Sequence, residues 1–81
     1  MGCPNEPISQ LMQIGAVLRQ AREEAGLSQG ELAKAAKLSR IYISFLENDK
    51  SSPTLDSLFR IAAVLELKAS TIVARIEREN D

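Results

Sequence analysis

Histidine is missing from this 81-residue sequence, and cysteine occurs once, at Cys3. The nitrogen and sulfur ligands of most protein metal sites are therefore nearly absent, and one cysteine cannot form an intrachain disulfide. The same absence removes the Ser-His and Cys-His pairs of nucleophilic catalysis, and neither a glycine-rich phosphate loop nor a carboxylate pair suited to acid–base chemistry is present. We therefore expect no metal, no cofactor, no small-molecule ligand and no enzymatic activity, and we interpret Cys3 as part of a flexible tail over residues 1–8.

Long apolar runs are also absent. No stretch approaches the roughly 20 residues that a membrane-spanning helix requires. The first residues, M-G-C-P-N-E, lack the apolar region of a signal peptide. These features predict a cytoplasmic protein that does not contact a membrane.

Glycine, proline and aromatic residues are scarce, whereas hydrophobic residues make up 44% of the chain. Leucine, isoleucine and alanine supply most of them, which is typical of an all-α domain. A single domain of this size buries only about 60% of the surface of its unfolded chain, so dimerisation would add useful burial.

Five segments carry apolar residues at helical spacing, and residues 9–79 are predicted to form one domain. The first helix is expected from Ser9 to Ala25, with Gly26 as its C-terminal stop. The predicted N-caps of the following four helices are Ser28, Ser39, Thr54 and Ser70. The apolar stripe expected on the fourth helix consists of Leu55, Leu58, Phe59, Ala62 and Leu65.

The segment from residue 27 to residue 48 is the most informative part of the chain. Ser28 and Glu31 have the spacing of a capping box, and the small side chains of Ala33 and Ala36 allow a second helix to cross close above the first. Two short capped helices joined by a tight turn can deliver a helix into the major groove of DNA. Two capped amphipathic helices are also common in small helical proteins, so periodicity alone leaves both interpretations open.

The second of these helices is expected to have two distinct faces. Ser39 is its N-cap, and Ile43 and Leu46 form its inward stripe. An arginine in the first turn of such a helix is placed to read bases. The opposite face carries Arg40, Ile41, Ser44 and Phe45.

This combination resembles the lambda-repressor-like helix-turn-helix family of bacterial and phage regulators. The match runs from about Ile14 to Leu67. Within the family, S-R-I-Y-I-S at residues 39–44 looks most like the small controller proteins of restriction-modification systems. The residues that carry the resemblance are Ser28, Gln29, Glu31, Leu32, Ala33, Ser39, Ile43, Leu46, Glu47 and Asn48, followed by P-T-L-D-S-L-F-R-I-A-A-V-L from Pro53 to Leu65.

Two positions depart from the family pattern. Lys37 and Asp49 stand where the family usually has glycine. A non-glycine residue must therefore accept a left-handed or distorted backbone at each turn, at a modest cost in strain.

The resemblance implies a compact five-helix DNA-binding fold that reads sequence with the second helix of the pair. Arg40 can present its planar fork to guanine N7 and O6, although a phosphate contact is the alternative. Ser44 can bond a base edge or a phosphate, and Ile41 can touch a thymine methyl group. Phe45 either meets a thymine methyl group or packs under the following loop.

Backbone contacts are expected from residues that flank this helix. Gln29 matches the family position that contacts phosphate, at the start of a helix. Tyr42 is long enough to reach the backbone, although a half-buried core tyrosine fits equally well. The residues predicted to contact phosphate are Gln29, Ser39, Tyr42, Lys50, Ser51 and Ser52.

Arg22 and Glu47 are the clearest candidate pair. Both fall at the edge of an apolar stripe, and the resemblance implies a salt bridge between them. The sequence alone fits two solvated surface charges as well.

Dimerisation is expected because one such unit reads only a few base pairs, whereas a two-fold dimer reads an inverted repeat. Ile72, Val73 and Ile76 are the best surplus apolar surface, and in the controller proteins this helix contributes to the dimer interface. Packing against the first helix of the same chain is the alternative.

The charge balance is unusual for a DNA-binding domain, because ten Lys and Arg oppose eleven Asp and Glu, for a net charge of −1. Cations nevertheless gather around the helix pair and acidic residues toward the C-terminus, which predicts a dipolar surface. We expect a homodimeric regulator of transcription that binds double-stranded DNA, similar to a restriction-modification controller that both activates and represses. The alternative is an antitoxin or bridging module of the same fold whose main ligand is a protein.

Overall fold

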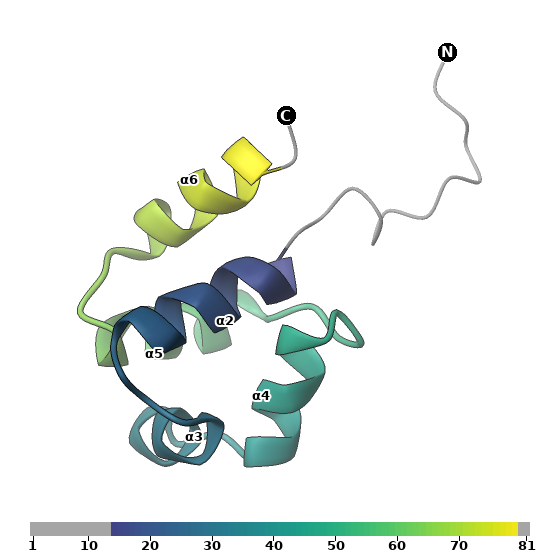
Figure 1. Cartoon of the computed structure of the whole chain (residues 1–81), viewed down its shortest axis with the longest axis vertical. Coiled ribbons are helices and arrows are strands. Elements are labelled where there is room, and N and C mark those ends of the chain that lie inside the picture. Colours follow the sequence, from purple (N-terminus) through teal and green to yellow (C-terminus); the bar gives the residue numbers. More distant parts are fainter. Residues whose placement is uncertain (1–13, 80–81) are drawn as a thin grey trace.

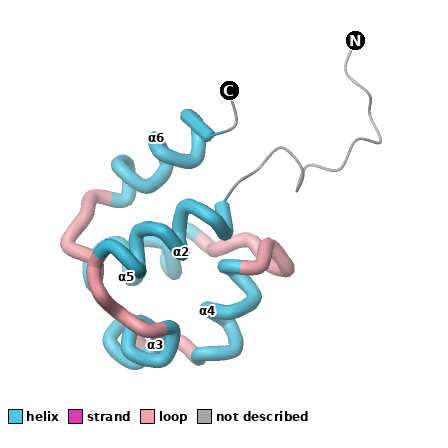
Figure 2. The backbone as a smooth tube through the Cα atoms, in the orientation of Figure 1, coloured by secondary structure: helices cyan, strands magenta, loops and turns pink. Residues whose placement is uncertain are grey.

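The computed structural model describes residues 14–79, which form five helices (Figure 1). No strand occurs in this part of the chain (Figure 2), so the predicted all-α fold is confirmed. The predicted tail over residues 1–8, Cys3 and the expected helix start at Ser9 lie outside the described residues. The helices are α2 (Ile14–Glu24), α3 (Gln29–Ala36), α4 (Arg40–Glu47), α5 (Leu55–Val64) and α6 (Ala69–Glu79).

Three of the predicted N-caps are confirmed. The hydroxyl of Ser28 accepts from the backbone N–H of Glu31 at 3.0 Å, and the Glu31 carboxylate accepts from the Ser28 N–H at 2.8 Å. Both halves of the capping box are therefore formed. Ser39 caps α4 and Thr54 caps α5, each by accepting from the N–H three residues later at 3.0 Å.

The predicted cap of the last helix is wrong. α6 begins at Ala69, so Ser70 lies inside the first turn. The carbonyl of Lys68 accepts from the N–H groups of Thr71 and Ile72, which starts the helix without a side-chain cap. At the other end of the chain, α2 ends at Glu24, one residue before the expected Ala25.

Three helices are followed by a non-glycine residue with a left-handed backbone. Lys37 has φ 61° and Asp49 has φ 57°, at the two positions where glycine is usual in the family. Glu66, with φ 58°, is a third such residue that the sequence did not indicate. Each position costs on the order of 1–3 kcal/mol unless its surroundings compensate.

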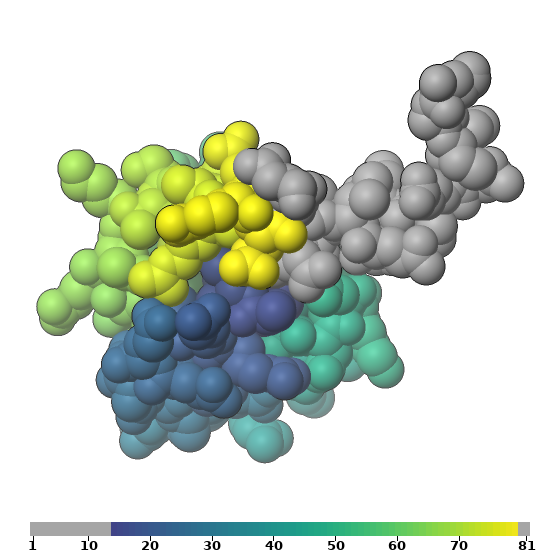
Figure 3. All heavy atoms as spheres, turned by 45° about the horizontal axis from the view of Figure 1, so that its top comes forward, coloured from purple at the N-terminus to yellow at the C-terminus, as the bar shows by residue number. Residues whose placement is uncertain are grey.

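All five helices contribute side chains to the core. α4 packs against α2 and α3, α5 packs against α3 and α6, and α6 packs against α2. In Figure 1, α2 lies between α6 and the α3–α4 pair, and the space-filling view in Figure 3 shows α6 lying over α2. None of the helices in residues 14–79 is long and apolar enough to cross a membrane. The most completely buried side chains are Leu18, Leu32, Ile43, Leu46, Ile61 and Ile72.

The C-terminal helix corrects one expectation. Ile72 is 0% exposed and Ile76 is 8% exposed, because both pack into the core of their own chain. They are therefore not available as a dimer interface. As the alternative expectation had it, they pack within their own chain. Val73, which follows Ile72 and lies beside this buried stripe, is 40% exposed.

Candidate functional site

α4, the second helix of the predicted helix-turn-helix pair and here called the recognition-type helix, has a buried and an exposed face. Ile43 and Leu46 are buried in the core, three residues apart on one side of the helix. Ile41 and Phe45 lie on the opposite side and are 67% and 46% exposed. Arg40 is also exposed and Ser44 is partly exposed, so all four predicted base-reading residues are accessible on α4. The helical period produces this division, since residues three or four apart share a face.

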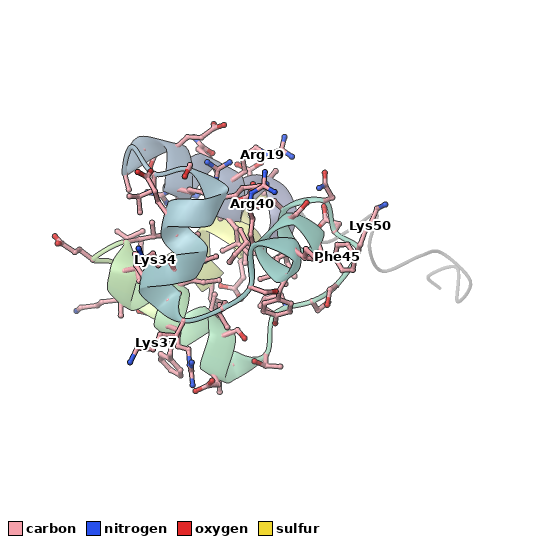
Figure 4. All side chains as sticks on the ribbon, turned by 90° about the horizontal axis from the view of Figure 1, so that it is seen from below. Arg19, Lys34, Lys37, Arg40, Phe45 and Lys50 are labelled. Carbon is pink, nitrogen blue, oxygen red and sulfur yellow. The ribbon has the colours of Figure 1, made fainter. Side chains whose placement is uncertain are left out.

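Arg40 extends from the first turn of α4 alongside α3 (Figure 4). Its Cδ would lie 3.7 Å from a Cβ built on Gly30, so its aliphatic stem runs past the first turn of α3. The stem is supported by a neighbouring helix while the guanidinium stays accessible. A supported arginine loses less side-chain entropy when it binds a ligand.

Glu47, at the end of α4, is the buried centre of a group of polar side chains that we call the Glu47 cluster: Glu47, Arg22, Gln29 and Arg19. The Arg22 Nε donates to Glu47 Oε2 at 2.6 Å, and Arg22 Nη2 donates to Oε1 at 3.0 Å. Gln29 Nε2 donates to the same Oε1 at 3.0 Å, and Arg19 Nε lies 3.6 Å from it. The carboxylate is 1% exposed and the Arg22 side chain 11%, so this pair is not a pair of solvated surface charges.

The cluster joins three helices. Arg22 belongs to α2, Gln29 to α3 and Glu47 to α4. Arg22 Nη1 also donates to the carbonyl of Leu27 at 2.7 Å, which holds the α2–α3 connection. No side-chain nitrogen or oxygen that is buried in the described residues lacks a hydrogen-bond partner. The cluster therefore sets the position of α4 relative to the two preceding helices.

Burial and hydrogen bonding have opposite effects on the pKa values of Glu47 and Arg22. Burial by itself would raise the pKa of Glu47. Hydrogen bonds from Arg22 and Gln29, together with the positive charges of Arg22 and Arg19, outweigh this effect, so the pKa of Glu47 is lowered. The hydrogen bond to Glu47 raises the pKa of Arg22 against the opposing effect of burial. Both groups are therefore charged at neutral pH.

Gly15 is a structural residue that the sequence reasoning missed. A Cβ built on it would lie 2.7 Å from the carbonyl carbon of Glu47 and 2.8 Å from the carbonyl oxygen of Leu46. α2 and the end of α4 can therefore approach closely only with glycine at this position. The Gly15 N–H donates to Asp49 Oδ1 at 2.9 Å, which offsets part of the strain at Asp49.

The residues predicted to contact phosphate are not equivalent. Gln29 donates to Glu47, which uses one of its two amide hydrogens. The Tyr42 hydroxyl donates to Ser57 Oγ at 3.1 Å and the ring is partly buried, as in the alternative of a half-buried core tyrosine. Lys50 and Ser52 are exposed in the loop before α5, Ser51 is partly buried there, and the exposed Ser39 caps α4.

Arg19 is a further cation that the sequence reasoning did not single out. Its side chain is 47% exposed, and its Nη2 donates to Asn48 Oδ1 at 3.5 Å. Asn48 Nδ2 in turn donates to the carbonyl of Ser44 at 2.8 Å and lies 3.4 Å from its Oγ. The position of Arg19 one turn before Arg22 was the available signal.

A second accessible feature is an apolar groove between α5 and α6, which we call the α5–α6 groove. Leu55 is 69% exposed and Phe59 is 56% exposed, although both were expected in the apolar stripe of their helix. With Val73 they line a concavity of about 680 Å³. Exposed apolar side chains gathered in one groove indicate a surface that binds another molecule.

A metal site finds no support in the described part of the chain. No group of three or more His, Cys, Asp or Glu side chains in residues 14–79 could hold an ion. The accessible features are thus the outer face of α4, the exposed cations around it and the α5–α6 groove.

Comparison with known proteins identifies a helix-turn-helix family. A family model described as helix-turn-helix matches residues 18–72. The immunity repressor protein of Bacillus phage phi105 is 37% identical over 62 residues, which cover 76% of this chain and 43% of the repressor. The transcriptional regulator SinR of Bacillus subtilis is 34% identical over 61 residues, which cover 74% of this chain and 55% of SinR. The chain thus spans about half the length of these two relatives.

Solved structures show the same similarity. The structure of SinR in complex with DNA superposes with a TM-score of 0.71 at 33% identity, covering 74% of this chain and 97% of that one. The restriction-modification controller protein C.AhdI from Aeromonas hydrophila superposes with a TM-score of 0.74 at 28% identity, covering 79% of this chain and 97% of the controller. In both comparisons most of the described chain is matched.

Proposed function

The protein belongs to the helix-turn-helix family, and on that premise we propose that it is a sequence-specific DNA-binding regulator of transcription. The observation that carries the proposal is the outer face of α4. Arg40, Ile41 and Phe45 are exposed there although the opposite face of the same helix is buried in the core. Exposed isoleucine and phenylalanine beside an arginine fit the floor of a major groove, where guanine acceptors and thymine methyl groups lie side by side.

Each residue on this face has a distinct role in the proposal. Arg40 binds guanine N7 and O6 with its fork, and Ile41 and Phe45 contact thymine methyl groups. Ser44 bonds a base edge one turn further along α4. Lys50 and Ser52, in the loop after α4, contact the neighbouring phosphates and fix the register without reading sequence.

The regulator acts as a homodimer on an inverted repeat. The predicted interface at Ile72 and Ile76 is replaced in this proposal, because those side chains are buried within the chain. The α5–α6 groove takes their place, with Leu55, Phe59 and Val73 as its exposed apolar residues. Of the three residues expected in the interface, Val73 alone lines the groove.

Charges at the two ends of the groove favour a second copy as its occupant. Lys68 lines the end formed by the α5–α6 connection. Asp56 lies in the first turn of α5, next to Leu55 at the other end, and its side chain stays 75% exposed while pairing with Arg60 at 2.9 Å. A two-fold axis through the middle of the groove exchanges its ends and brings Lys68 of one copy opposite Asp56 of the other. Such a surface is self-complementary.

Two kinds of relatives bear on the biological role. The similarity to C.AhdI supports a role as a restriction-modification controller, and the similarity to SinR, described as a master regulator for biofilm formation, supports a regulator of a different process. Their TM-scores of 0.74 and 0.71 are of the same order, so the proposal stays at the level of a DNA-binding transcriptional regulator.

The proposal is tested by selecting duplexes from a random pool and titrating the protein against the selected operator, an operator changed at the guanine, and a random duplex. Arg40→Ala should weaken binding to the selected operator by about 1–3 kcal/mol and relax preference at one position in each half-site. Binding to the random duplex should change little beyond the loss of one charge.

Lys50→Ala is the matched control: it also removes one positive charge, but a phosphate contact carries no base information, so its loss should weaken binding to all three duplexes equally. Equal losses for Arg40→Ala on all three duplexes would show that Arg40 is a phosphate contact and that specificity resides in Ile41, Ser44 or Phe45.

The alternative function is a module whose main ligand is a protein. The α5–α6 groove favours it, and one similar structure, 30% identical over 84% of this chain, is a complex of SinR with the SinI protein. Salt separates the two functions, because DNA binding through several phosphates must weaken steeply as salt rises. Absence of any salt-dependent DNA binding would exclude the proposed function and favour the protein ligand.

A further inference from the structure

The Glu47 cluster contains more positive charge than its carboxylate can neutralise. Glu47 accepts two hydrogen bonds from Arg22 and one from Gln29, all within 3.0 Å. Arg19 Nε lies 3.6 Å from Glu47 Oε1, beyond these shorter contacts. One carboxylate thus faces two guanidinium groups, and the more exposed of them, Arg19 at 47% against 11% for Arg22, carries the surplus charge at the surface.

The surplus charge is held next to the recognition-type helix. Arg19 donates to Asn48 Oδ1, and the amide nitrogen of Asn48 donates to the carbonyl of Ser44 and approaches its hydroxyl. Asn48 therefore connects a cation on α2 to a residue on the exposed side of α4. Because the Ser44 oxygen faces the Asn48 amide as an acceptor, its own hydrogen is available to donate to a base.

Arg19 also lies beside the residue expected to contact the DNA backbone. Arg19 and Gln29 approach the same oxygen of Glu47, at 3.6 Å and 3.0 Å, although they come from different helices. In Figure 4 the labelled Arg19 and Arg40 extend toward the same side of the molecule. A DNA strand that passes Arg40 and Gln29 would therefore also pass Arg19.

We infer that Arg19 binds a backbone phosphate of the operator and that Asn48 is the positioning residue that orients it and couples it to Ser44. The guanidinium has donors beyond those directed at Glu47 and Asn48, and its fork matches the oxygens of a phosphate. Glu47 lies near the Nε of Arg19 but does not neutralise its charge, because the Glu47 carboxylate is already paired with Arg22. This inference rests on the proposed function, since it names a further contact of the same DNA-binding surface.

The test measures affinity for a random duplex and for the selected operator across a series of salt concentrations. Arg19→Ala should weaken binding to both duplexes on the order of tenfold and should reduce the slope of log affinity against log salt by about 0.9, the value for one phosphate contact. Arg19→Lys should retain the slope, because it keeps the charge, while losing part of the affinity with the fork.

Arg78→Ala is the matched control. Arg78 is an exposed arginine on α6, which packs against α2 and α5 on the far side of α2 from α3 and α4 (Figure 1). Its substitution removes the same net charge and should leave both the slope and the affinity close to those of the parent protein.

Asn48→Ala tests whether Asn48 acts through Arg19 or only stabilises the fold. It should reduce affinity for the random duplex in the parent background and have no further effect when Arg19 is already alanine. Base preference at the Ser44 contact should also relax. Thermal unfolding of each variant checks that the domain remains folded at the temperature of the titration.

The outcomes separate the two proposals. If the parent protein shows no salt-dependent DNA binding, the proposed function fails. If the parent protein binds DNA but Arg19→Ala matches Arg78→Ala in slope and affinity, the regulator remains and the phosphate contact of Arg19 is wrong. If Asn48→Ala reduces affinity equally with and without Arg19, its role as a positioning residue is overturned.

Discussion

The Glu47 cluster buries a carboxylate and a guanidinium, whereas the α5–α6 groove leaves leucine, phenylalanine and valine side chains in solvent. Both regions depart from the ordinary burial preference of their residues. In the cluster the departure is resolved inside the chain, because every buried side-chain donor and acceptor of the described residues finds a partner. In the groove nothing within residues 14–79 covers the apolar side chains. A buried charge with a full set of partners therefore indicates a structural role, and an exposed apolar groove indicates a binding surface.

Breaking the cluster should have the largest effect. Arg22→Ala leaves the buried carboxylate of Glu47 without its main partner, and we expect the free energy of unfolding to fall by about 3 kcal/mol. Urea unfolding measures it. Arg75→Ala, which removes a more exposed pair with Glu24, is the control and should cost less than about 1 kcal/mol. Additive losses in the Arg22→Ala, Glu47→Ala double mutant would show that the two residues do not interact.

If the proposed homodimer forms through the α5–α6 groove, a charge placed in the groove should separate the two copies without unfolding them. Phe59→Asp should raise the dimer dissociation constant at least about 100-fold, equivalent to about 2.7 kcal/mol, because the aspartate must be desolvated in the interface. Analytical ultracentrifugation at tens of micromolar measures the association.

Phe45→Asp is the matched control, since that phenylalanine is 46% exposed on α4, compared with 56% for Phe59. It should leave the dimer intact. A parent protein that sediments as a monomer would contradict the assignment of a second copy to the groove.

The close approach of α2 and α4 beside the cluster allows a finer test. Gly15→Ala forces a methyl group against the backbone of Glu47 and should destabilise the fold by about 1–3 kcal/mol. Gly30→Ala meets only ordinary contacts, with Arg40 Cδ at 3.7 Å and Ser28 Oγ at 4.0 Å, so it should be neutral or slightly stabilising through helix propensity. Comparable unfolding curves for the two variants would show that the helices can separate at little cost.

Lowering the pH should reduce the stability that the Glu47 cluster gives to the fold, whereas the apolar side chains of the α5–α6 groove carry no group that titrates. The pKa of Glu47 is lowered in the folded state, so the unfolded chain binds the proton first as pH falls. The stabilisation is complete above the ordinary glutamate pKa of about 4.3 and is lost as pH falls through the lower folded value. Urea unfolding between neutral and acid pH should therefore show a smaller acid-dependent loss for Glu47→Gln than for the parent protein. Parallel losses in the two proteins would mean that Glu47 does not titrate differently on folding.

Local chemistry explains why much of the fold was predictable. Ser28, Ser39 and Thr54 are N-caps in the structure as predicted, because a cap depends on a hydroxyl and an N–H three residues away. The left-handed backbone at Lys37 followed from the family's usual glycine there. Ser70 is not a cap, because α6 begins at Ala69, two residues before the start that a cap at Ser70 implies.

The sequence by itself determined the helices, the exposed face of α4 and the opposite charges of Arg22 and Glu47. Only the tertiary structure decided which apolar residues stay outside. Ile72 and Phe59 both belong to amphipathic helices, yet one is fully buried and the other is 56% exposed. Helical spacing defines a stripe, whereas burial depends on which neighbouring helix covers it, and that is set by packing of segments distant in the chain. For the same reason Gly15 and Arg19 acquired their roles only when α2 was placed against the end of α4.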